Sequence, residues 1–522
     1  MLRKSFLVLV VIIVISDVEA YRILGVFPHT SKSHATIFLA VMKGLVEKGH
    51  NVTVVSTRTF DTDRNNYVHV DLSKDIRVTM GTVNISIVNN DKALTRYLTA
   101  YHLFNRNIDK CEKGLSSPTF QKFLKTRGEK YDVVIFEYFA VDCFLGVISK
   151  INAPIIGLSS STLMPWVAER MGNPSNTAYV PNNLLAFSDK MSFWQRMENT
   201  VISIGHKLLF QFYKLPRDKK LARKYIGKKG SKLEKFLYNS SLLLSNTHFS
   251  LNLPRPLVPN VIEIGGIHIE KPHPLPEYLE RWIESSPSGV IYFSLGSLIN
   301  GQSLGDERKN IFLKTFERFP QKVIWKWENE SVPHNHDKVL LGKWMPQLDI
   351  LCHPNTRLFI SHGGLLSVME AVHCGVPMVV IPQMGEQYTN AKALEAQGAG
   401  IILLLSEISE TTTFNAVQEG LSSKIKENME QLSDRFRDRP MSPLDTAVYW
   451  VEYVIRHKGA PHMKTAAVDM PFYQYYLLDV FFTLFLIFLG SLYLIVYSAK
   501  GICKYISRNR ILGTNKKGDK TE

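Results

Sequence analysis

The sequence predicts an α/β protein of two successive parallel-sheet domains, followed by one C-terminal helix that crosses a membrane. Arg22–Phe27 and Asn51–Ser56 are apolar segments of strand length, and the amphipathic stretch between them has helical periodicity and stops at Gly49. A second strand-rich unit of the same kind begins near Val290. A long uncharged apolar run near the C-terminus completes the pattern.

In the first domain, the strand, helix and strand over 22–56 form a βαβ unit, which favours a parallel sheet. Residues 131–136 and 154–158 are expected to be later strands of the same sheet. The proline-rich stretch 272–276 separates this unit from the second one. We therefore expect domains at 21–275 and 276–460, with a helix over 444–456 that crosses back toward the first domain.

Each end of the chain carries one hydrophobic segment, and the two segments predict different functions. Residues 1–20 combine early cations, an apolar run and the small residue Ala20, which predicts a cleaved signal peptide. Residues 477–498 have the length and apolarity of a transmembrane helix, preceded by a juxtamembrane segment at 461–476. Cations in the tail 499–522 place that tail in the cytosol, so the predicted topology is single-pass type I. The alternative, a buried core helix, fits poorly with tyrosines on one side and cations on the other.

The formal net charge of +15 is concentrated in two segments. Residues 207–235 hold eleven Lys or Arg against two acidic residues, and residues 500–522 hold seven against two, so these segments account for 14 of the 15 units. The rest of the chain is nearly neutral, which argues against a nucleic-acid partner. Residues 207–235 mix cations with apolar side chains, as in a helix that rests on anionic membrane lipid, or as in a solvated face over the core. Both readings stay open.

The cysteines show no C-x-x-C pair, which predicts neither a zinc site nor a disulfide framework. Asn84 and Asn329 begin sequons that we expect to be glycosylated, whereas Asn51 in a strand and Asn239 in a buried position are weaker candidates. The five cysteines are Cys111, Cys143, Cys352, Cys374 and Cys503.

The stretch 344–387 carries the chemistry of a nucleotide-sugar site. Residues 357–361 form a short apolar strand, and the turn His362-Gly363-Gly364 then leads into a helix over 365–373. A helix N-terminus offers free N–H groups to a diphosphate, and glycines let the backbone approach it closely. A turn of this kind alone is common in α/β proteins, so the neighbouring residues decide the interpretation.

Those neighbours fit one ligand. Trp344 offers an apolar face to a uracil, and Gln347 an amide to the ribose or base edge. Glu370 lies on the second helical turn, where a carboxylate can accept both ribose hydroxyls. Glu386 and Gln387 follow the next strand and suit sugar hydroxyls. Upstream, Ser297 follows another buried strand, where its hydroxyl can meet the terminal phosphate.

Together these residues carry the motifs W-x-P-Q, F-I-x-H-G-G, E-A-x-x-x-G-V-P and E-Q in order. From about Tyr21 to its C-terminus the chain resembles the UDP-glycosyltransferase family, and in particular the membrane-bound animal members of arthropod type. The resemblance implies the GT-B architecture of two facing Rossmann-like domains, an endoplasmic reticulum membrane location and catalytic domains in the lumen. It also implies donor contacts at Ser297, Trp344, Gln347, His362, Gly363, Gly364, Ser367, Glu370, Glu386 and Gln387.

Catalysis requires a base for the acceptor hydroxyl, because the UDP leaving group already departs easily. His34 lies between the first strand and the first helix, at the ligand-binding edge of a parallel sheet. The resemblance makes it the base and places an acidic partner after the strand 131–136, where this chain has Glu137 in place of the family's aspartate. Asp142 is a competing partner for the imidazole, and the sequence does not decide between the two.

The expected reaction is inverting transfer of a hexose, most simply glucose, to a small lipophilic acceptor. UDP-glucuronate as donor, a catalytically silent UDP-sugar-binding subunit and a UDP-sugar epimerase on the same frame are the alternatives. We expect no metal cofactor, because the donor half has no D-x-D pair. A homo-oligomer is compatible with the sequence. Aromatic and apolar residues that could line an acceptor pocket, or simply pack the core, are Phe60, Tyr101, Phe104, Phe139, Met164, Trp166 and Phe193.

Overall fold

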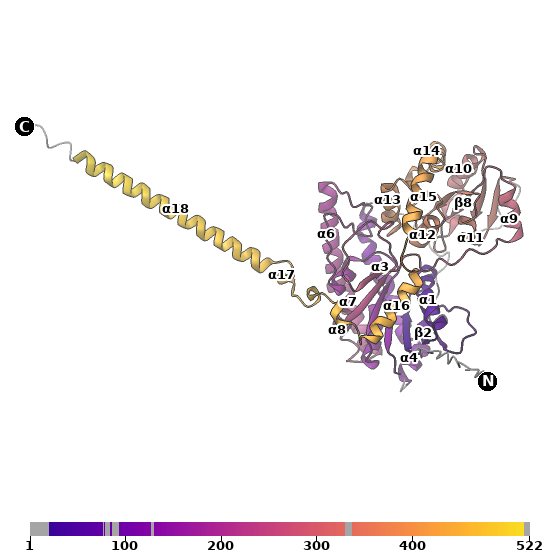
Figure 1. The fold of residues 1–522 in the computed structure, drawn as a ribbon, viewed down its shortest axis with the longest axis horizontal. Helices are drawn as coiled ribbons and strands as arrows, with labels where there is room; N and C mark the ends of the chain where they lie inside the picture. The colour runs from indigo at the N-terminus through magenta and orange to yellow at the C-terminus, as the bar shows by residue number, and fades with distance from the viewer. Residues whose placement is uncertain are drawn as a thin grey trace, which may run out of the picture. The chain divides into compact units, whose positions relative to one another are not determined.

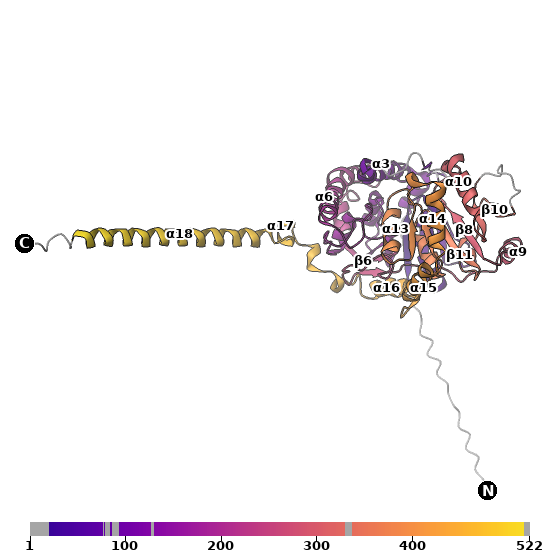
Figure 2. The same ribbon diagram turned by 90° about the horizontal axis from the view of Figure 1, so that it is seen from above.

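The structure, a computed structural model, describes residues 20–76, 78, 84–85, 93–126, 130–328 and 337–515. It falls into two units, a main body that ends at Lys464 and a C-terminal segment that begins at Thr465. The ribbon of the main body holds two sheets with helices on their faces (Figure 1, Figure 2). The predicted signal peptide, apart from Ala20, lies outside the described residues.

The first sheet has seven parallel strands in the order β3-β2-β1-β4-β5-β6-β7. Helix α1, Lys32–Glu47, connects β1 to β2, as the sequence predicted for a strand, helix and strand unit. Buried β-branched and apolar residues fill the central strands, which is typical of a sheet covered on both faces. The strands are β1 Arg22–Phe27, β2 Asn51–Ser56, β3 Tyr67–Asp71, β4 Val133–Glu137, β5 Ile155–Ser159, β6 Ser240–Ser245 and β7 Val261–Glu263.

The second sheet has six parallel strands in the order β10-β9-β8-β11-β12-β13. In both sheets the strand order reverses beside the first strand, which creates the crevice where ligands bind in such folds. The prediction of two parallel-sheet domains with a C-terminal apolar helix is therefore confirmed. The strands are β8 Val290–Ser294, β9 Lys322–Lys326, β10 Val339–Gly342, β11 Thr356–Ser361, β12 Met378–Val380 and β13 Gly400–Ile402.

Helix α16, Pro443–Arg456, follows the second sheet in the chain but packs on the first. Its Val448 and Val451 join a core that contains Ile37 and Val41 of α1. The other helices are α3 Ala93–Ser116, α4 Pro118–Lys125, α5 Pro165–Ala168, α6 Phe193–Leu209, α7 Leu215–Tyr225, α8 Leu233–Leu237, α9 Glu277–Glu284, α10 Asp306–Glu317, α11 Gln347–Leu351, α12 Leu365–His373, α13 Gln387–Ala396, α14 Glu410–Gly420, α15 Ser423–Arg437, α17 Phe472–Tyr475 and α18 Leu478–Asn515.

In the C-terminal segment, α18 is the one helix of the described chain that is long and apolar enough to span a membrane. Its apolar part, 480–497, is uncharged and exposed, as a lipid-facing surface would be. The helix runs beyond the predicted end at 498 into the basic tail. The chain thus carries one candidate membrane span.

The prediction that the cysteines form no disulfide is wrong. Cys111 of α3 bonds to Cys143 near the end of β4, and Cys352 bonds to Cys374 at the end of α12. The partners lie 32 and 22 residues apart in sequence, with no motif to mark them, and only the fold brings them together. Cys503 is free and exposed.

Reduction of the two disulfides should lower the stability of the main body. Closing loops of this length removes unfolded-state entropy worth about 3 to 4 kcal/mol for each bond. We expect a fall in the thermal midpoint of the detergent-solubilised full chain when dithiothreitol is added, measured by differential scanning fluorimetry. A Cys503→Ser variant should lose the same amount on reduction. An unchanged midpoint in reductant would contradict a structural role for the disulfides.

Of the other sequence expectations, Asn239 is exposed and not buried, with its side chain accepting a hydrogen bond from Lys464 Nζ at 3.0 Å. Asn51 is also exposed, and Asn329 lies outside the described residues. The apolar residues of 207–235 divide between two roles. Leu208 and Phe212 are exposed, whereas Phe210, Leu215 and Leu221 are buried and pack in the core.

Candidate active site

His34 and Glu137 form a hydrogen-bonded pair at the carboxyl edge of the first sheet. His34 Nδ1 lies 2.7 Å from Glu137 Oε1. The two residues are 103 positions apart, but β1 and β4 are neighbours, so the segments that follow them meet at one edge. Glu137 is fully buried, and this burial raises the pKa of its carboxyl, although the His34 contact acts in the opposite direction.

Asp142, the competing partner of His34, lies elsewhere. It begins a 3₁₀ helix after β4, and its Oδ1 accepts a hydrogen bond from Arg170 Nη1 at 2.8 Å. Both members of this ion pair are almost fully buried. The extra turn of backbone between Glu137 and Asp142 rotates the second carboxylate into the core. The structure therefore places Glu137, and not Asp142, in contact with the imidazole.

Three residues surround His34: Phe139, which the sequence suggested for an acceptor pocket, and His29 and Ser160, which it did not indicate. The His29 ring stacks on the His34 ring with a 4.0 Å separation of centroids, and Phe139 packs edge-on at 4.5 Å. Ser160 Oγ lies 3.2 Å from His34 Nδ1. Burial, followed by the nearby His34, lowers the pKa of His29 well below its usual value, so His29 is neutral. Phe139 follows β4, the neighbour of β1, and Ser160 follows β5, the next strand in the sheet, so the edge rule used for Glu137 could have placed both near His34.

On the opposing domain, His362 occupies the centre of the glycine turn. A Cβ atom on Gly364 would lie 2.5 Å from His362 Nε2, and one on Gly296 would lie 2.5 Å from His362 Cε1. Gly363 also needs its positive φ of +80°. Side chains at Gly364 and Gly296 would collide with the imidazole, and one at Gly363 would collide with Val380, so all three positions require glycine. Burial lowers the pKa of His362 to about 4, which keeps the ring neutral beside the N-terminus of α12.

Gln347, Ser367 and Glu370 are brought together as one polar cluster. Gln347 Nε2 donates to Ser367 Oγ at 2.9 Å and to Glu370 Oε2 at 2.7 Å. Trp344, three residues earlier, is 51% exposed, and Lys32 Nζ of the first domain lies 3.6 Å from its ring centroid. This arrangement joins an accessible indole to fixed amide and carboxylate groups, which suits a nucleoside.

Glu386 and Gln387 lie at the start of α13, and Glu386 contacts the first domain. The Ser161 hydroxyl bonds to Glu386, whose burial raises its pKa to about 7. Gln387 is buried, and its Oε1 accepts hydrogen bonds from the backbone N–H groups of Gln383 at 2.8 Å and Met384 at 3.1 Å. Gln387 thus fixes the loop after β12. Ser297 lies in the turn after β8, next to Gly296.

Replacement of Gln387 by alanine should weaken donor use. Two loop N–H groups would lose their acceptor, at about 1 to 3 kcal/mol, which corresponds to roughly a tenfold or greater fall in kcat/KM for the donor. Steady-state kinetics with varied UDP-sugar measures this. Gln397→Ala at the other end of α13 is the matched control and should leave donor kinetics within twofold. Equal kinetics for the two variants would show that the loop is dispensable.

The aromatic residues proposed for an acceptor pocket mostly have other roles. Phe104, Met164 and Trp166 are buried in the core of the first domain, and Tyr101 and Phe193 are exposed on α3 and α6. Phe60 packs on Tyr67 beyond β2. Only Phe139 of this set contacts His34 among the described residues.

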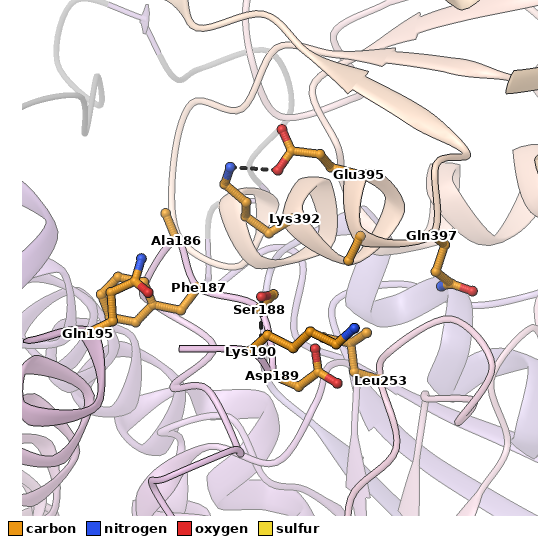
Figure 3. A pocket seen from close by; sticks show the side chains of 11 residues that line it. Ala186, Phe187, Ser188, Asp189, Lys190, Gln195, Leu253, Lys392, Glu395 and Gln397 are labelled. Carbon is orange, nitrogen blue, oxygen red and sulfur yellow. Dashed lines mark hydrogen bonds and ion pairs between the residues drawn. The ribbon is translucent and has the colours of Figure 1, made fainter. Parts of the chain in front are cut away.

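A separate cavity of about 480 Å³ lies between the loop before α6 and the end of α13 (Figure 3). Its wall includes the ion pair between Lys392 and Glu395, together with Asp189 and Lys190 of the facing loop. None of the residues placed above in the site lines it.

Two sheets that face each other across a histidine–carboxylate pair and a glycine turn define a transferase of the GT-B class. Solved structures with this architecture include the glycosyltransferase of kitacinnamycin, at TM-score 0.54 and 18% identity over 83% of this chain and 98% of that one. The calicheamicin glycosyltransferase CalG4 matches at TM-score 0.54 and 16% identity over 84% and 99%. These similarities concern the fold.

The sequence comparisons are more specific. The family model described as UDP-glucuronosyl and UDP-glucosyl transferase matches residues 23–518, so the chain belongs to the UDP-glycosyltransferase family. It is 41% identical to UDP-glycosyltransferase UGT5 of Dactylopius coccus, over 94% of each chain. It is 38% identical to UDP-glucosyltransferase 2 of the same insect, over 94% of this chain and 95% of that one. Human UDP-glucuronosyltransferase 1A8 is 32% identical over 86% of each chain.

Proposed function

We propose that this enzyme transfers a hexose with inversion from a UDP-sugar to the hydroxyl of a small lipophilic acceptor, with His34 as the base. The observation that carries the proposal is the hydrogen bond between His34 Nδ1 and the buried Glu137. A carboxylate on Nδ1 fixes the tautomer in which Nε2 is free to accept a proton, and it stabilises the imidazolium that then forms. The deprotonated acceptor attacks the anomeric carbon, and UDP leaves from the opposite face.

The second domain would stabilise the negative charge that develops on the departing UDP. The N–H groups at the start of α12, the Ser297 hydroxyl and the neutral His362 surround the position that the diphosphate would take. A helix N-terminus stabilises such an anion without a proton transfer.

We propose that the reaction needs no metal ion. His29, His34 and Glu137 are close enough for one ion to be considered. However, the two rings are stacked with an interplanar angle of 17°, so their in-plane lone pairs point in parallel and do not converge on one point. The helix N-terminus supplies the electrostatic role that a metal would otherwise have.

For the donor we propose glucose, with glucuronic acid as the second candidate. Two relatives from Dactylopius coccus and human UDP-glucuronosyltransferase 1A8 carry names that span both sugars. The sugar-facing residues of this chain, Glu386 and Gln387, include no cation for a sugar carboxylate. This favours a neutral hexose.

UDP release from the full chain in microsomes tests the proposal, with UDP-glucose and UDP-glucuronate in parallel and a panel of phenolic acceptors. Acceptor-dependent release with UDP-glucose is the expected result. Release with UDP-glucuronate alone would reassign the sugar. UDP binding without release under any condition would instead support the catalytically silent subunit.

We further propose that the enzyme is a single-pass type I protein of the endoplasmic reticulum with its main body in the lumen.

One exposed surface of the main body supports an additional contact with membrane lipid. Helix α6 and the turn after it carry seven exposed apolar side chains at helical spacing, and exposed Arg217, Lys220, Arg223 and Lys224 follow along α7. This combination fits the interface of an anionic bilayer. Helix α6 lies on the outside of the main body (Figure 2). The exposed apolar side chains of this surface are Phe193, Trp194, Met197, Val201, Ile204, Leu208 and Phe212.

A fluorophore on single cysteines tests this contact in the full chain. In a Cys503→Ser background, a polarity-sensitive label at Phe212→Cys should be quenched by brominated lipids in anionic vesicles. Val68→Cys on β3, 56% exposed in the native protein, is the matched control and should not be quenched. A label at 212 that brominated lipid leaves unquenched would point to a second copy of the chain as the occupant.

A further inference from the structure

Two cations of the first domain lie close to each other near its contact with the second: Lys32, which meets Trp344 of the second domain, and Arg58, whose charge acts on Lys32. Lys32 is the first residue of α1, and its Nζ lies 3.6 Å above the ring of Trp344. Arg58 lies in the loop after β2, the strand next to β1. Lys326, at the end of β9 in the second domain, is close enough to affect both Lys32 and His362.

Lys32 and Arg58 have no counter-ion among the described residues. Lys32 makes no ion pair there, and the Nε and Nη2 atoms of Arg58 are buried without a hydrogen-bond partner. Burial lowers the pKa of Lys32, and the charges of Arg58 and Lys326 lower it further. Burial also lowers the pKa of Arg58. Both residues are half-buried, and unpaired cations that are partly removed from water and repel one another are costly unless an anion binds between them.

Lys326 is different because it is already partly neutralised. Its Nζ lies 2.6 Å from Glu328 Oε1, and Glu328 Oε2 accepts the N–H of Gly301 at 2.9 Å. The unsatisfied positive charge therefore comes from the first domain, across the cleft from the glycine turn.

Two contacts between the domains show which part of a donor these cations face. At one end Lys32 meets Trp344, the candidate uracil platform. At the other end, the Ser161 hydroxyl bonds to Glu386, the proposed sugar-facing carboxylate. The neighbouring Ser160 hydroxyl contacts the proposed base His34, so the base and that carboxylate lie at the same end. Lys32, with Arg58 near it, thus lies on the nucleotide side of the base, and the anionic group of the donor on that side is the diphosphate.

We propose that Lys32 and Arg58 bind the diphosphate of the UDP-sugar from the first domain, opposite the glycine turn that holds it from the second. The inference rests on the proposed function and adds a role for residues outside the donor motifs. Lys32 lies two positions before His34 on the first turn of α1, so one helix start would place the base and hold the leaving group. Donor binding would then draw the two domains together, and the same charges would stabilise UDP as it departs.

The test compares nucleotide affinity in full-length Lys32→Gln and Arg58→Gln variants with UDP, UMP and uridine as probes, by isothermal titration in detergent. We expect UDP affinity to fall about tenfold or more in each variant, UMP affinity to fall less, and uridine affinity to stay within about twofold. Lys32→Arg should restore most of the UDP affinity. Lys43→Gln on the same helix, whose partner is Glu270, and Arg64→Gln in the exposed part of the same loop are matched controls that should not differ from wild type.

The outcomes separate this inference from the proposed function. Equal losses for uridine and UDP would assign the cations to the nucleoside and overturn the inference. Losses in kcat/KM with UDP-glucuronate but not with UDP-glucose would assign them to a sugar carboxylate and overturn it as well. Unchanged UDP affinity in both variants, beside normal binding by wild type, would overturn it while leaving the proposed function intact. Absence of UDP binding by the wild-type chain would overturn both.

Discussion

Replacement of His34 by alanine is expected to reduce turnover by about 10³-fold, within the range that general-base catalysis provides. The His34 imidazole lies at the carboxyl edge of the first sheet and is held by a carboxylate, with Nδ1 at 2.7 Å from Glu137 Oε1. Without it the acceptor hydroxyl must lose its proton to water. UDP affinity should stay within about twofold, because the variant leaves every proposed donor-binding residue of both domains in place.

Two quantities test this expectation: the rate of UDP release at saturating acceptor, and the affinity for UDP measured by titration. His29→Ala is an informative control, because His29 stacks on His34 but has no carboxylate partner in the described chain. It should lower turnover by much less than His34→Ala. Normal turnover in a folded His34→Ala protein would refute the mechanism. Loss of UDP binding in that variant would show that the residue is structural.

The parallel sheets could be predicted because the apolar strands and amphipathic helices of a unit such as 22–56 have strong periodicity. Edge geometry then explains why residues that follow neighbouring strands, such as His34 and Glu137, come together across 103 positions. The same rule could have indicated Ser160, which follows β5, but that serine has no motif to draw attention to it.

Other features depend on three-dimensional packing that no local pattern records. The disulfides join cysteines from elements that meet only after the sheets have formed. The choice between Glu137 and Asp142 depends on the 3₁₀ helix after β4 and on Arg170, which lies 28 residues beyond Asp142 and pairs with it. The stack of His29 on His34 depends on side-chain rotamers. The spacing of these residues in the sequence does not predict such contacts.

Glu137→Gln and Asp142→Asn are expected to fail in different ways, because the structure gives the two carboxylates different partners. Glu137→Gln keeps the shape of the side chain but removes the negative charge that stabilises a protonated His34. By analogy with triads in which the corresponding acid becomes an amide, turnover should fall by about 10² to 10⁴-fold. Thermal stability should change little or rise, because burial disfavours the charged form of this carboxyl.

Asp142→Asn should instead destabilise the protein by roughly 3 kcal/mol, because Arg170 would remain buried without its counter-ion. The folded fraction should keep nearly normal kcat, since Asp142 does not contact His34 in the described structure. Thermal midpoints and kcat, measured for both variants in one preparation series, separate the two effects. If Asp142→Asn lost turnover while remaining stable, and Glu137→Gln did not, the orienting acid would have to be reassigned. Near-normal turnover in both variants would show that His34 needs no carboxylate, and the glutamate that replaces the family's aspartate would then have no catalytic consequence.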